Sequence, residues 1–128
     1  MSDLNLQEIH KINRYEVFFD NTGLSQEEAN ALRLACFAVE QPSSRTVRFT
    51  FYDFEGSKEY KALNKLANST SCKVAISCYD GAHNKYESIT ITGICSTEPV
   101  LDFRWSAGTT WRNLVLYMTE VEIVSVRA

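Results

Sequence analysis

The chain lacks the cysteine patterns, apolar runs and leader sequence that identify many metal, membrane and secreted proteins. Its four cysteines, Cys36, Cys72, Cys78 and Cys95, form no CxxC pair, and their spacing matches no zinc ribbon or finger. No apolar run reaches the roughly 20 residues that a membrane-spanning helix needs. The polar N-terminus does not resemble a signal peptide. These absences predict a cytosolic protein with free, buried cysteines.

An excess of positive charge is also missing. The sequence has 13 Lys and Arg against 16 Asp and Glu, which gives a formal net charge of −3. Tight binding to nucleic acid depends on Lys and Arg that contact phosphates, and a protein with this role usually carries a basic surface. The overall charge therefore speaks against general nucleic-acid binding.

What remains is the composition of one β-rich domain. The chain has 128 residues, of which 45% are hydrophobic and 12% are aromatic. This length suits a single domain whose core needs neither a metal nor disulfides. Aromatic side chains favour strands. No repeat or linker divides the sequence, so we expect a polar arm over residues 1–13 and one domain over residues 14–128.

The first expected elements are a strand and a helix. Residues 14–20 alternate, with Tyr15, Val17 and Phe19 on one face. Ser25 and Glu28 form a capping box, which predicts that a helix begins at residue 26.

The end of this helix stays open from sequence. The helix extends through Phe37 in one interpretation, and residues 32–41 form a strand in the other. We favour a short helical turn followed by a strand. Pro42 is expected to end either element, because it lacks an amide donor.

The middle of the chain predicts a half-buried strand and then a helix. Over residues 45–53, Val47, Phe49 and Phe51 share the buried face, and Arg48, Thr50 and Tyr52 share the exposed one. Residues 53–56 predict a turn. Ser57 is expected to cap a helix over 58–67, with an apolar stripe and a solvated lysine face. The stripe consists of Tyr60, Leu63, Leu66 and Ala67, and the lysines are Lys58, Lys61 and Lys65.

Residues 72–93 predict a β-hairpin, because two alternating runs flank a turn that begins at Asp80-Gly81. Val74, Ile76, Ile89 and Ile91 lie on its apolar face, and Ser, Thr and Lys lie on the other. Gly93 permits a bend or bulge. A short strand over 101–105 and a long one over 110–126 follow, and the long strand is apolar on both faces near its middle. This order predicts an α+β fold: a mainly antiparallel β-sandwich or barrel with one packed α-helix.

Candidate chemical sites are weak in this sequence. Cys78 or Cys95 with His83 would be a thiol nucleophile and base, but no flanking motif supports the pair, so we expect no enzyme. Asp53, Glu55 and Asp80 are interpreted as turn residues rather than metal ligands. A competing hypothesis is a small β-barrel module that stacks single-stranded nucleic acid on tyrosines beside two lysines. These residues are Tyr52, Tyr79, Tyr86, Lys73 and Lys85.

The order and spacing of the elements resemble the tube proteins of contractile-tailed bacteriophages, which are related in fold to the ring protein of type VI secretion. The resemblance runs from Arg14 to the C-terminus. It covers RYEVFFD, the VEQPSS stretch, RTVRFTFYDF, the EYKALNKLA helix, the hairpin that ends in Gly93-Ile94-Cys95, LDFRW and the final strand. Two features depart from the family: the helix carries no Trp, and residues 40–45 leave little room for a long protruding loop.

The resemblance implies a structural virion protein that needs no cofactor. Its hexameric rings would stack into a hollow tail tube through which DNA passes during ejection, with the polar face of the hairpin lining the bore. The implied partners are further copies of the chain, the tail sheath, the tape measure protein and the baseplate, and assembly would take place in the host cytoplasm. The residues that we expect to contact other subunits or partners are Asp53, Phe54, Lys58, Lys61, Lys65, Asp80, Gly81 and His83. A tube-like protein of the baseplate, on which the tube starts, is the alternative with the same fold.

Overall fold

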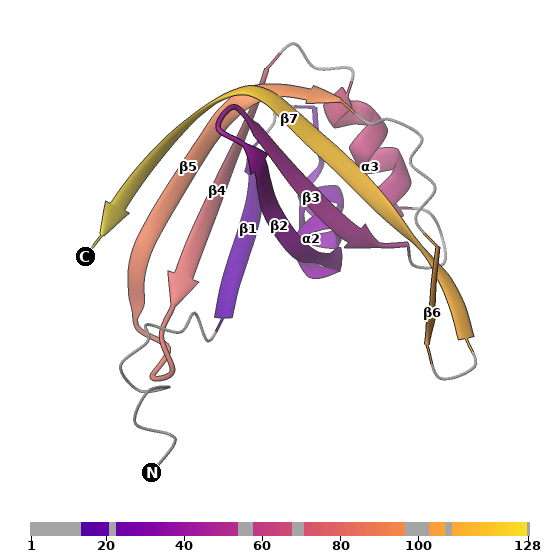
Figure 1. Ribbon diagram of the computed structural model, residues 1–128, viewed down its shortest axis with the longest axis horizontal. Helices are drawn as coiled ribbons and strands as arrows, with labels where there is room; N and C mark the ends of the chain where they lie inside the picture. Colours follow the sequence, from indigo (N-terminus) through magenta and orange to yellow (C-terminus); the bar gives the residue numbers. More distant parts are fainter. Residues whose placement is uncertain are drawn as a thin grey trace.

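We describe a computed structural model of the chain (Figure 1). It describes residues 14–20, 23–53, 58–67, 71–96, 103–106 and 109–127. The expected arm over residues 1–13, the expected Ser57 cap and all but Asp53 of the expected turn over 53–56 lie outside this range.

The first strand and the helix after it form where the sequence predicts them. Strand β1 spans Arg14–Asp20, and its Val17 and Phe19 are buried. Helix α2 spans Gln26–Ala35. The Ser25 hydroxyl accepts a hydrogen bond from the Glu28 amide at 3.1 Å, and the Ser25 amide donates to the Glu28 carboxylate at 3.0 Å. The capping box is therefore confirmed.

Both interpretations of residues 32–41 were partly right. The helix continues to Ala35, longer than the short turn that we favoured, and strand β2 then spans Cys36–Ser43. The prediction that Pro42 ends this element is wrong. Strand β2 lies at the edge of the sheet, and its pairing with β3 is irregular between Glu40 and Ser43. An edge strand tolerates proline because one of its sides needs no amide donor.

Strand β3 spans Thr46–Tyr52, and its Val47, Phe49 and Phe51 are buried as predicted. Thr50, which we expected on an exposed face, is also buried. It lies opposite Val115 of the last strand, which is buried too. The centre of the sheet is therefore covered on both faces.

Helix α3 spans Lys58–Ala67, as predicted. Its buried residues are Glu59, Ala62, Leu63 and Leu66, and Tyr60 is 52% exposed. The predicted apolar stripe is therefore wrong at Tyr60. Positions 59, 62, 63 and 66 lie on one side of a helix with 3.6 residues per turn, which leaves residue 60 outside this stripe.

The hairpin consists of β4, Cys72–Tyr79, and β5, Lys85–Ser96. Val74 faces Ile91 and Ile76 faces Ile89 across this pair, as the alternation predicts. Strands β6, Phe103–Ser106, and β7, Thr109–Arg127, complete the described chain. Residues 113–116 of β7 are all buried, which confirms that its middle is covered on both faces.

Six strands form one strongly arched sheet in the order β1-β4-β5-β7-β3-β2, and β6 pairs with β7 outside this path (Figure 1). All of these pairs are antiparallel. Helices α2 and α3 lie under the arch. We call the face with Val74 and Phe49 the inner face and the opposite one the outer face. Phe19 of β1 packs against Phe49 and Phe51 of β3, with ring centroids 5.5 Å and 5.7 Å apart. Strand β1 at one end of the arch therefore packs across the core against β3 in the other half.

The predicted fold class is confirmed: the chain is α+β, with mainly antiparallel strands curled into a half-barrel. The helical part is larger than predicted, because α2 joins α3 in covering the inner face.

One pair of cysteines corrects the prediction of free thiols. Cys72 and Cys95 form a disulfide with a Cα–Cα distance of 6.1 Å, whereas Cys36 and Cys78 are free. The two partners are 23 residues apart in sequence. Only the pairing of β4 with β5 brings the two cysteines together. Their separation along the sequence does not indicate that they form a disulfide.

A bulge lies where β5 crosses β7. Thr92 pairs with Glu122, whereas Ile94 pairs with Thr119, so β7 has one extra residue at this point. Glu120 is this extra residue, and its backbone has a φ of 52°. A Cβ added to Gly93 would lie 2.7 Å from the Thr119 carbonyl oxygen. Only glycine allows this close approach, which confirms the bulge expected at Gly93.

We predict that Gly93→Ala lowers the free energy of unfolding by about 1–3 kcal/mol, because the new methyl group pushes on the backbone of β7. Urea denaturation of the purified protein measures this change. Gly81→Ala is the matched control, since nothing lies within 4 Å of a Cβ there, and its effect should stay within about 0.5 kcal/mol. Equal effects of the two substitutions would contradict this account of Gly93.

We also predict that Ile76→Lys prevents folding, because it places an unpaired charge among the buried residues of the inner face. Circular dichroism would show a loss of native β signal. Lys73→Ile, an exposed position on the other face of β4, should leave the spectrum unchanged. A folded Ile76→Lys protein would mean that the faces of the hairpin are assigned wrongly.

Candidate interaction surface

The most distinctive feature outside the core is a four-stranded part of the sheet with two free edges. It consists of β1, β4, β5 and the end of β7, Glu122–Arg127, which pairs with residues 87–92 of β5. Strand β3 stops pairing with β7 at Thr119, and the amide of Val121 donates to the Arg45 carbonyl oxygen at 3.2 Å. Within the described residues, the other side of Glu122–Arg127 has no strand beside it. We call this segment the β7 edge.

Strand β1 forms the second free edge. Residues 14–20 pair with β4 along their whole length on one side, and among the described strands none pairs with them on the other. Unpaired amides and carbonyls along a strand are a template for pairing with another chain. The four-stranded part can therefore extend its ladder at both ends.

Apolar side chains are exposed on the outer face at both edges. Val124 and Val126 of the β7 edge are 60% and 62% exposed, and Phe18 of β1 is 41% exposed. The registers place Phe18, Ala75, Thr90 and Val124 in one row across the four strands. Apolar side chains at the border of a sheet favour an interface that covers them.

The outer face between these edges is mainly polar, as the alternation of the hairpin predicts. Ser77, Ser88, Thr90 and Thr92 lie on it, with Lys73 at one end of the hairpin. Lys73 and Thr92 lie in a row with Asp20 of β1 and Glu122 of β7. Charges of both signs therefore mark the rim of a hydroxyl-rich surface.

A third free edge is β2, which pairs only with β3 among the described strands. The ring of its Phe37 stacks on Tyr52 of β3, with centroids 4.3 Å apart. Further along the same ladder, Arg48 forms an ion pair of 2.8 Å with Glu40. These contacts reinforce the β2–β3 pair itself.

The lysines of α3 do more than face solvent. Lys58 pairs with Glu27, and Lys65 donates to the Glu28 carboxylate at 2.8 Å, so two of the three connect α3 to α2. The expected solvated face is confirmed, because Lys58 and Lys65 stay exposed at the surface while they form these ion pairs. Lys61 is exposed. Tyr60 on α3 and Leu34 on α2 add exposed apolar surface to this helical side.

Hydrogen bonding to Lys65 lowers the pKa of the Glu28 carboxyl from an ordinary value of 4.5 to about 2, and the Ser25 amide adds to the effect. The pKa of Lys58 is raised, mainly by its hydrogen bond to Glu27. Both shifts favour the charged forms, so these two ion pairs hold the helices together most strongly near neutral pH.

The other predicted contact residues do not join the lysines in one site. Asp53 is exposed at the end of β3, and Phe54 lies outside the described residues. Asp80, Gly81 and His83 form the loop of the hairpin. This loop follows the last residue of β4, whereas the first residue of β4 lies beside α3. The eight residues of β4 therefore separate the hairpin loop from α3 by about 25 Å.

Asp80 acts as a turn residue, as predicted. Its Oδ1 accepts hydrogen bonds of 2.9 Å from the amides of Ala82 and Asn84. His83 follows with a φ of 64°, a left-handed conformation that this tight loop requires.

The proposed thiol nucleophiles are not prepared for catalysis. Burial raises the pKa of the Cys78 thiol, and Glu87 adds to the effect. Cys95 is part of the disulfide, and burial raises the pKa of Cys36 to about 12. A nucleophilic cysteine needs a lowered pKa. No group of three or more His, Cys, Asp or Glu side chains within the described residues is placed to hold a metal ion.

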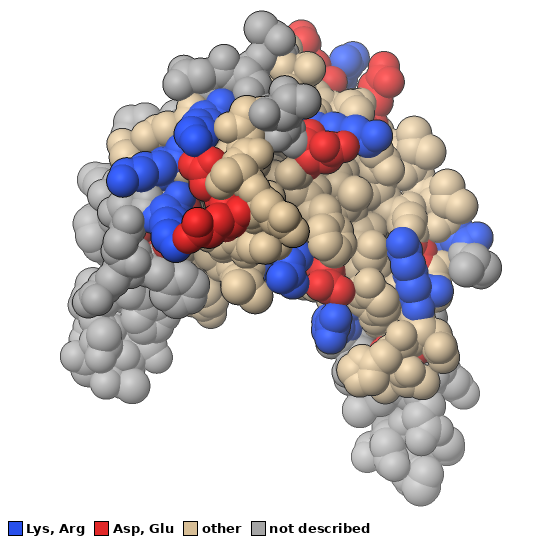
Figure 2. All heavy atoms as spheres, turned by 180° about the vertical axis from the view of Figure 1, so that it is seen from behind, with Lys and Arg blue, Asp and Glu red and all other residues tan. Residues whose placement is uncertain are grey.

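The tyrosines of the nucleic-acid hypothesis do not form one stacking surface. Tyr52 stacks on Phe37, and the guanidinium of Arg14 lies over the Tyr79 ring at 5.2 Å. Tyr86 packs against the core. On the side seen in Figure 2, blue and red side chains are intermixed, and no broad positive area appears. The arrangement therefore offers little to a phosphate backbone.

Sequence reasoning did not locate the free edges or the residues on them. Val124 and Val126 are exposed because of the bulge in β7 and because β3 stops pairing with β7 before it reaches them. The bulge and the end of this pairing can be located only when the strand registers are known. The sequence offered one signal: the predicted final strand is longer than any strand predicted to pair with it.

Comparisons with known proteins leave the family open. No family model matches the chain, and no curated protein matches it. Among solved structures, the chain is similar to the crystal structure of Hcp1 from Salmonella typhimurium, with 13% identity and a TM-score of 0.43, over 88% of this chain and 94% of that one. A similarity of this size assigns neither a family nor a function. No helix of the described residues is both long and apolar enough to cross a membrane.

The Glu28–Lys65 pair predicts a change of stability in acid. Because the folded-state pKa of Glu28 lies below its unfolded value, its stabilising effect is complete above about pH 4.5 and is lost as the pH falls towards 2. Glu28→Gln keeps an amide that can still cap the helix but removes the charge. Its urea midpoint should therefore fall less steeply than that of the wild type between pH 4.5 and 2.

Lys65→Met should flatten the same part of the profile, because it removes the main cause of the shift. Identical pH profiles for all three proteins would show that this pair does not form in solution.

Proposed function

We propose that this chain is a structural protein rather than an enzyme. Copies of it join edge to edge into closed rings, and the rings stack into the hollow tube of a phage tail. The observation that carries this proposal is the four-stranded part of the sheet, which ends at β1 on one side and at the β7 edge on the other. The resemblance to tail tube proteins supplies the tube, the tail and the hexameric number.

The strand directions suit head-to-tail joining. Neighbours in the order β1-β4-β5-β7 are antiparallel, so β1 and β7 run in opposite directions. When the β7 edge of one copy meets β1 of the next copy in the same orientation, the new pair is antiparallel as well. An even number of strands per subunit therefore continues the ladder without a break. Such a head-to-tail contact closes into a ring if the rotation per subunit allows it.

Joining the edges also covers the exposed apolar side chains. Phe18 lies on the outer face at one edge, and Val124 and Val126 lie on the same face at the other. A β7–β1 pair brings these side chains together across the joint, where cross-strand contacts stabilise a sheet. The unpaired amides and carbonyls of the two free edges thereby favour assembly.

The outer face then lines the bore, because the core and both helices occupy the inner face. Serine and threonine dominate the hairpin part of this face, and charges of both signs lie at its rim. A surface with few cations attracts phosphates weakly, so DNA slides through without adhering.

The helical side faces away from the bore in this arrangement. Lys61 and Tyr60 are exposed there, and they are the residues we propose for contact with a surrounding sheath. The tape measure protein and DNA would occupy the bore, the baseplate would begin the tube, and the protein would reside in the virion after assembly in the host cytoplasm. A tube-like baseplate protein would use the same edges to form a single ring.

Electron microscopy and sedimentation of the purified protein test the proposal. The wild type is expected to form rings or tubes. Val124→Lys and Val126→Lys together should reduce assembly at least tenfold, because they place charges in the joint. Both positions are exposed in the monomer, so the variant should remain folded and differ by no more than about 0.5 kcal/mol in stability.

Tyr60→Lys is the matched control: it replaces an exposed side chain by the same charge on α3, away from both edges. It should assemble as the wild type does. A wild type that stays monomeric at high concentration refutes the proposal, and tight, salt-sensitive binding of single-stranded DNA by that monomer would support the nucleic-acid module instead. Equal loss of assembly in both variants would remove the β7 edge from the contact.

A further inference from the structure

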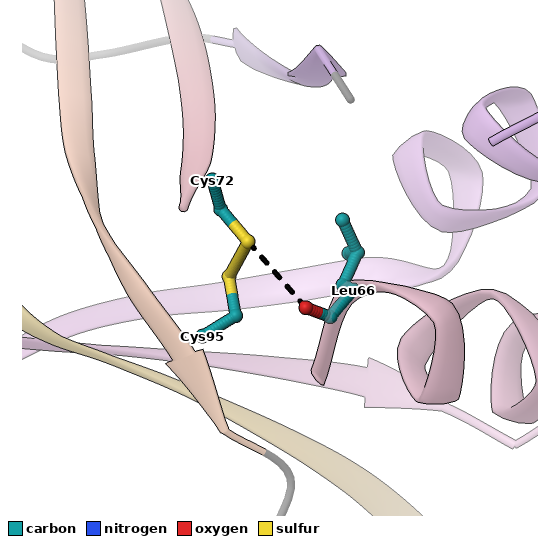
Figure 3. Close-up of a disulfide and its surroundings, with 3 residues drawn as sticks. All are labelled: Leu66, Cys72 and Cys95. Carbon is teal, nitrogen blue, oxygen red and sulfur yellow. Dashed lines mark hydrogen bonds between the residues drawn. A yellow bond between two sulfur atoms is a disulfide. The ribbon is translucent and has the colours of Figure 1, made fainter. Parts of the chain in front are cut away.

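Cys72 and Cys95 occupy a special place in the fold. Cys72 is the first residue of β4, and its register partner on β5 is Gly93, two residues before Cys95. The disulfide therefore runs diagonally across the hairpin on its inner face (Figure 3). Its Cα–Cα distance of 6.1 Å lies within the usual range for disulfides. Both residues are buried.

This bond lies at the junction of three parts of the molecule. Gly93, opposite Cys72, touches the bulge of β7, and Cys95 pairs with Met118 just before that bulge. On the other side, the Cys72 sulfur lies 3.6 Å from the carbonyl oxygen of Leu66, in the last turn of α3. The bond thus ties the end of α3 and the hairpin together where the four-stranded part meets the rest of the sheet.

The site also accommodates the reduced cysteines. A thiol at Cys72 can donate its S–H to the Leu66 carbonyl oxygen, which is among the last four carbonyls of α3 that have no partner within the helix. A thiol at Cys95 packs as a small apolar side chain in the core. Both reduced thiols therefore fit the site.

We propose that Cys72 and Cys95 form a redox-controlled clasp, open as two thiols and closed as a disulfide, which fixes the junction between α3, the hairpin and the β7 bulge. A small-molecule disulfide such as oxidised glutathione closes it. One cysteine thiolate attacks this disulfide and releases a first thiol, and the second cysteine then attacks the mixed disulfide and releases the other. Two protein thiols are oxidised, one glutathione disulfide is reduced to two thiols, and the two protons pass to the released thiolates. A dithiol reductant reverses the exchange.

Burial makes the clasp slow to change. Both sulfurs are shielded by the core and by the end of α3, so exchange requires local opening of this junction. The redox state set while the chain is loosely folded is therefore kept afterwards. This inference does not depend on the ring proposal, because it concerns contacts within one chain.

The test uses the full chain, oxidised with glutathione disulfide or reduced with a phosphine that is then removed. Maleimide labelling in denaturant, followed by mass spectrometry, should count four free thiols after reduction and two after oxidation. The oxidised form should melt about 10 °C higher, because closing the loop restricts the unfolded chain. Hydrogen exchange at residues 64–67 and 93–96 should be slower in the oxidised form, and exchange at Phe49 should be equal in both.

Two variants separate the clasp from a general effect of oxidation. Cys95→Ser should lose the difference in melting temperature, whereas Cys78→Ser, at another buried cysteine on the same sheet, should keep it. Four free thiols after oxidation, a disulfide mapped to other cysteines, or equal melting of the two forms would overturn the inference. Rings that form equally well in both states would leave it intact, and failure of all assembly would count against the ring proposal alone.

Discussion

The close approach of Gly93 to the backbone of β7 is the constraint on which the rest of the sheet depends. Strand β7 pairs with β3 over residues 113–119 and with β5 from residue 117 to its end, so it connects both halves of the arch. The change of register at Thr92 and Ile94 requires one extra residue in β7, and a side chain at position 93 would collide with the Thr119 carbonyl oxygen. Without this contact, the two halves could not share one strand.

The bulge has consequences on both sides of the sheet. It re-aims the last residues of β7, so that Val121 remains on the inner face while Val124 and Val126 lie on the outer face. Strand β3 does not follow β7 beyond this point, which leaves the β7 edge without a neighbouring strand among the described residues. The edge that we propose for assembly is thus a product of the same distortion that shapes the core.

Several predictions came from local signals and were confirmed for that reason. The capping box at Ser25 depends on residues three apart, and the alternation in 14–20 and 72–93 depends on neighbours two apart. The errors arose where a distant partner decided the outcome. Pro42 is tolerated because β2 has a strand on only one side, and Tyr60 is exposed because the core selects the neighbouring stripe of α3.

The sequence by itself determined most of the strands and helices and most of their apolar faces, because these properties repeat over short distances along the chain. The tertiary structure alone decided the strand order, the pairing of Cys72 with Cys95, and the edges that remain free. Those features depend on which strands lie side by side, and this is set by packing between residues far apart in sequence. A pattern of apolar and polar residues specifies the faces of a strand but not its neighbour.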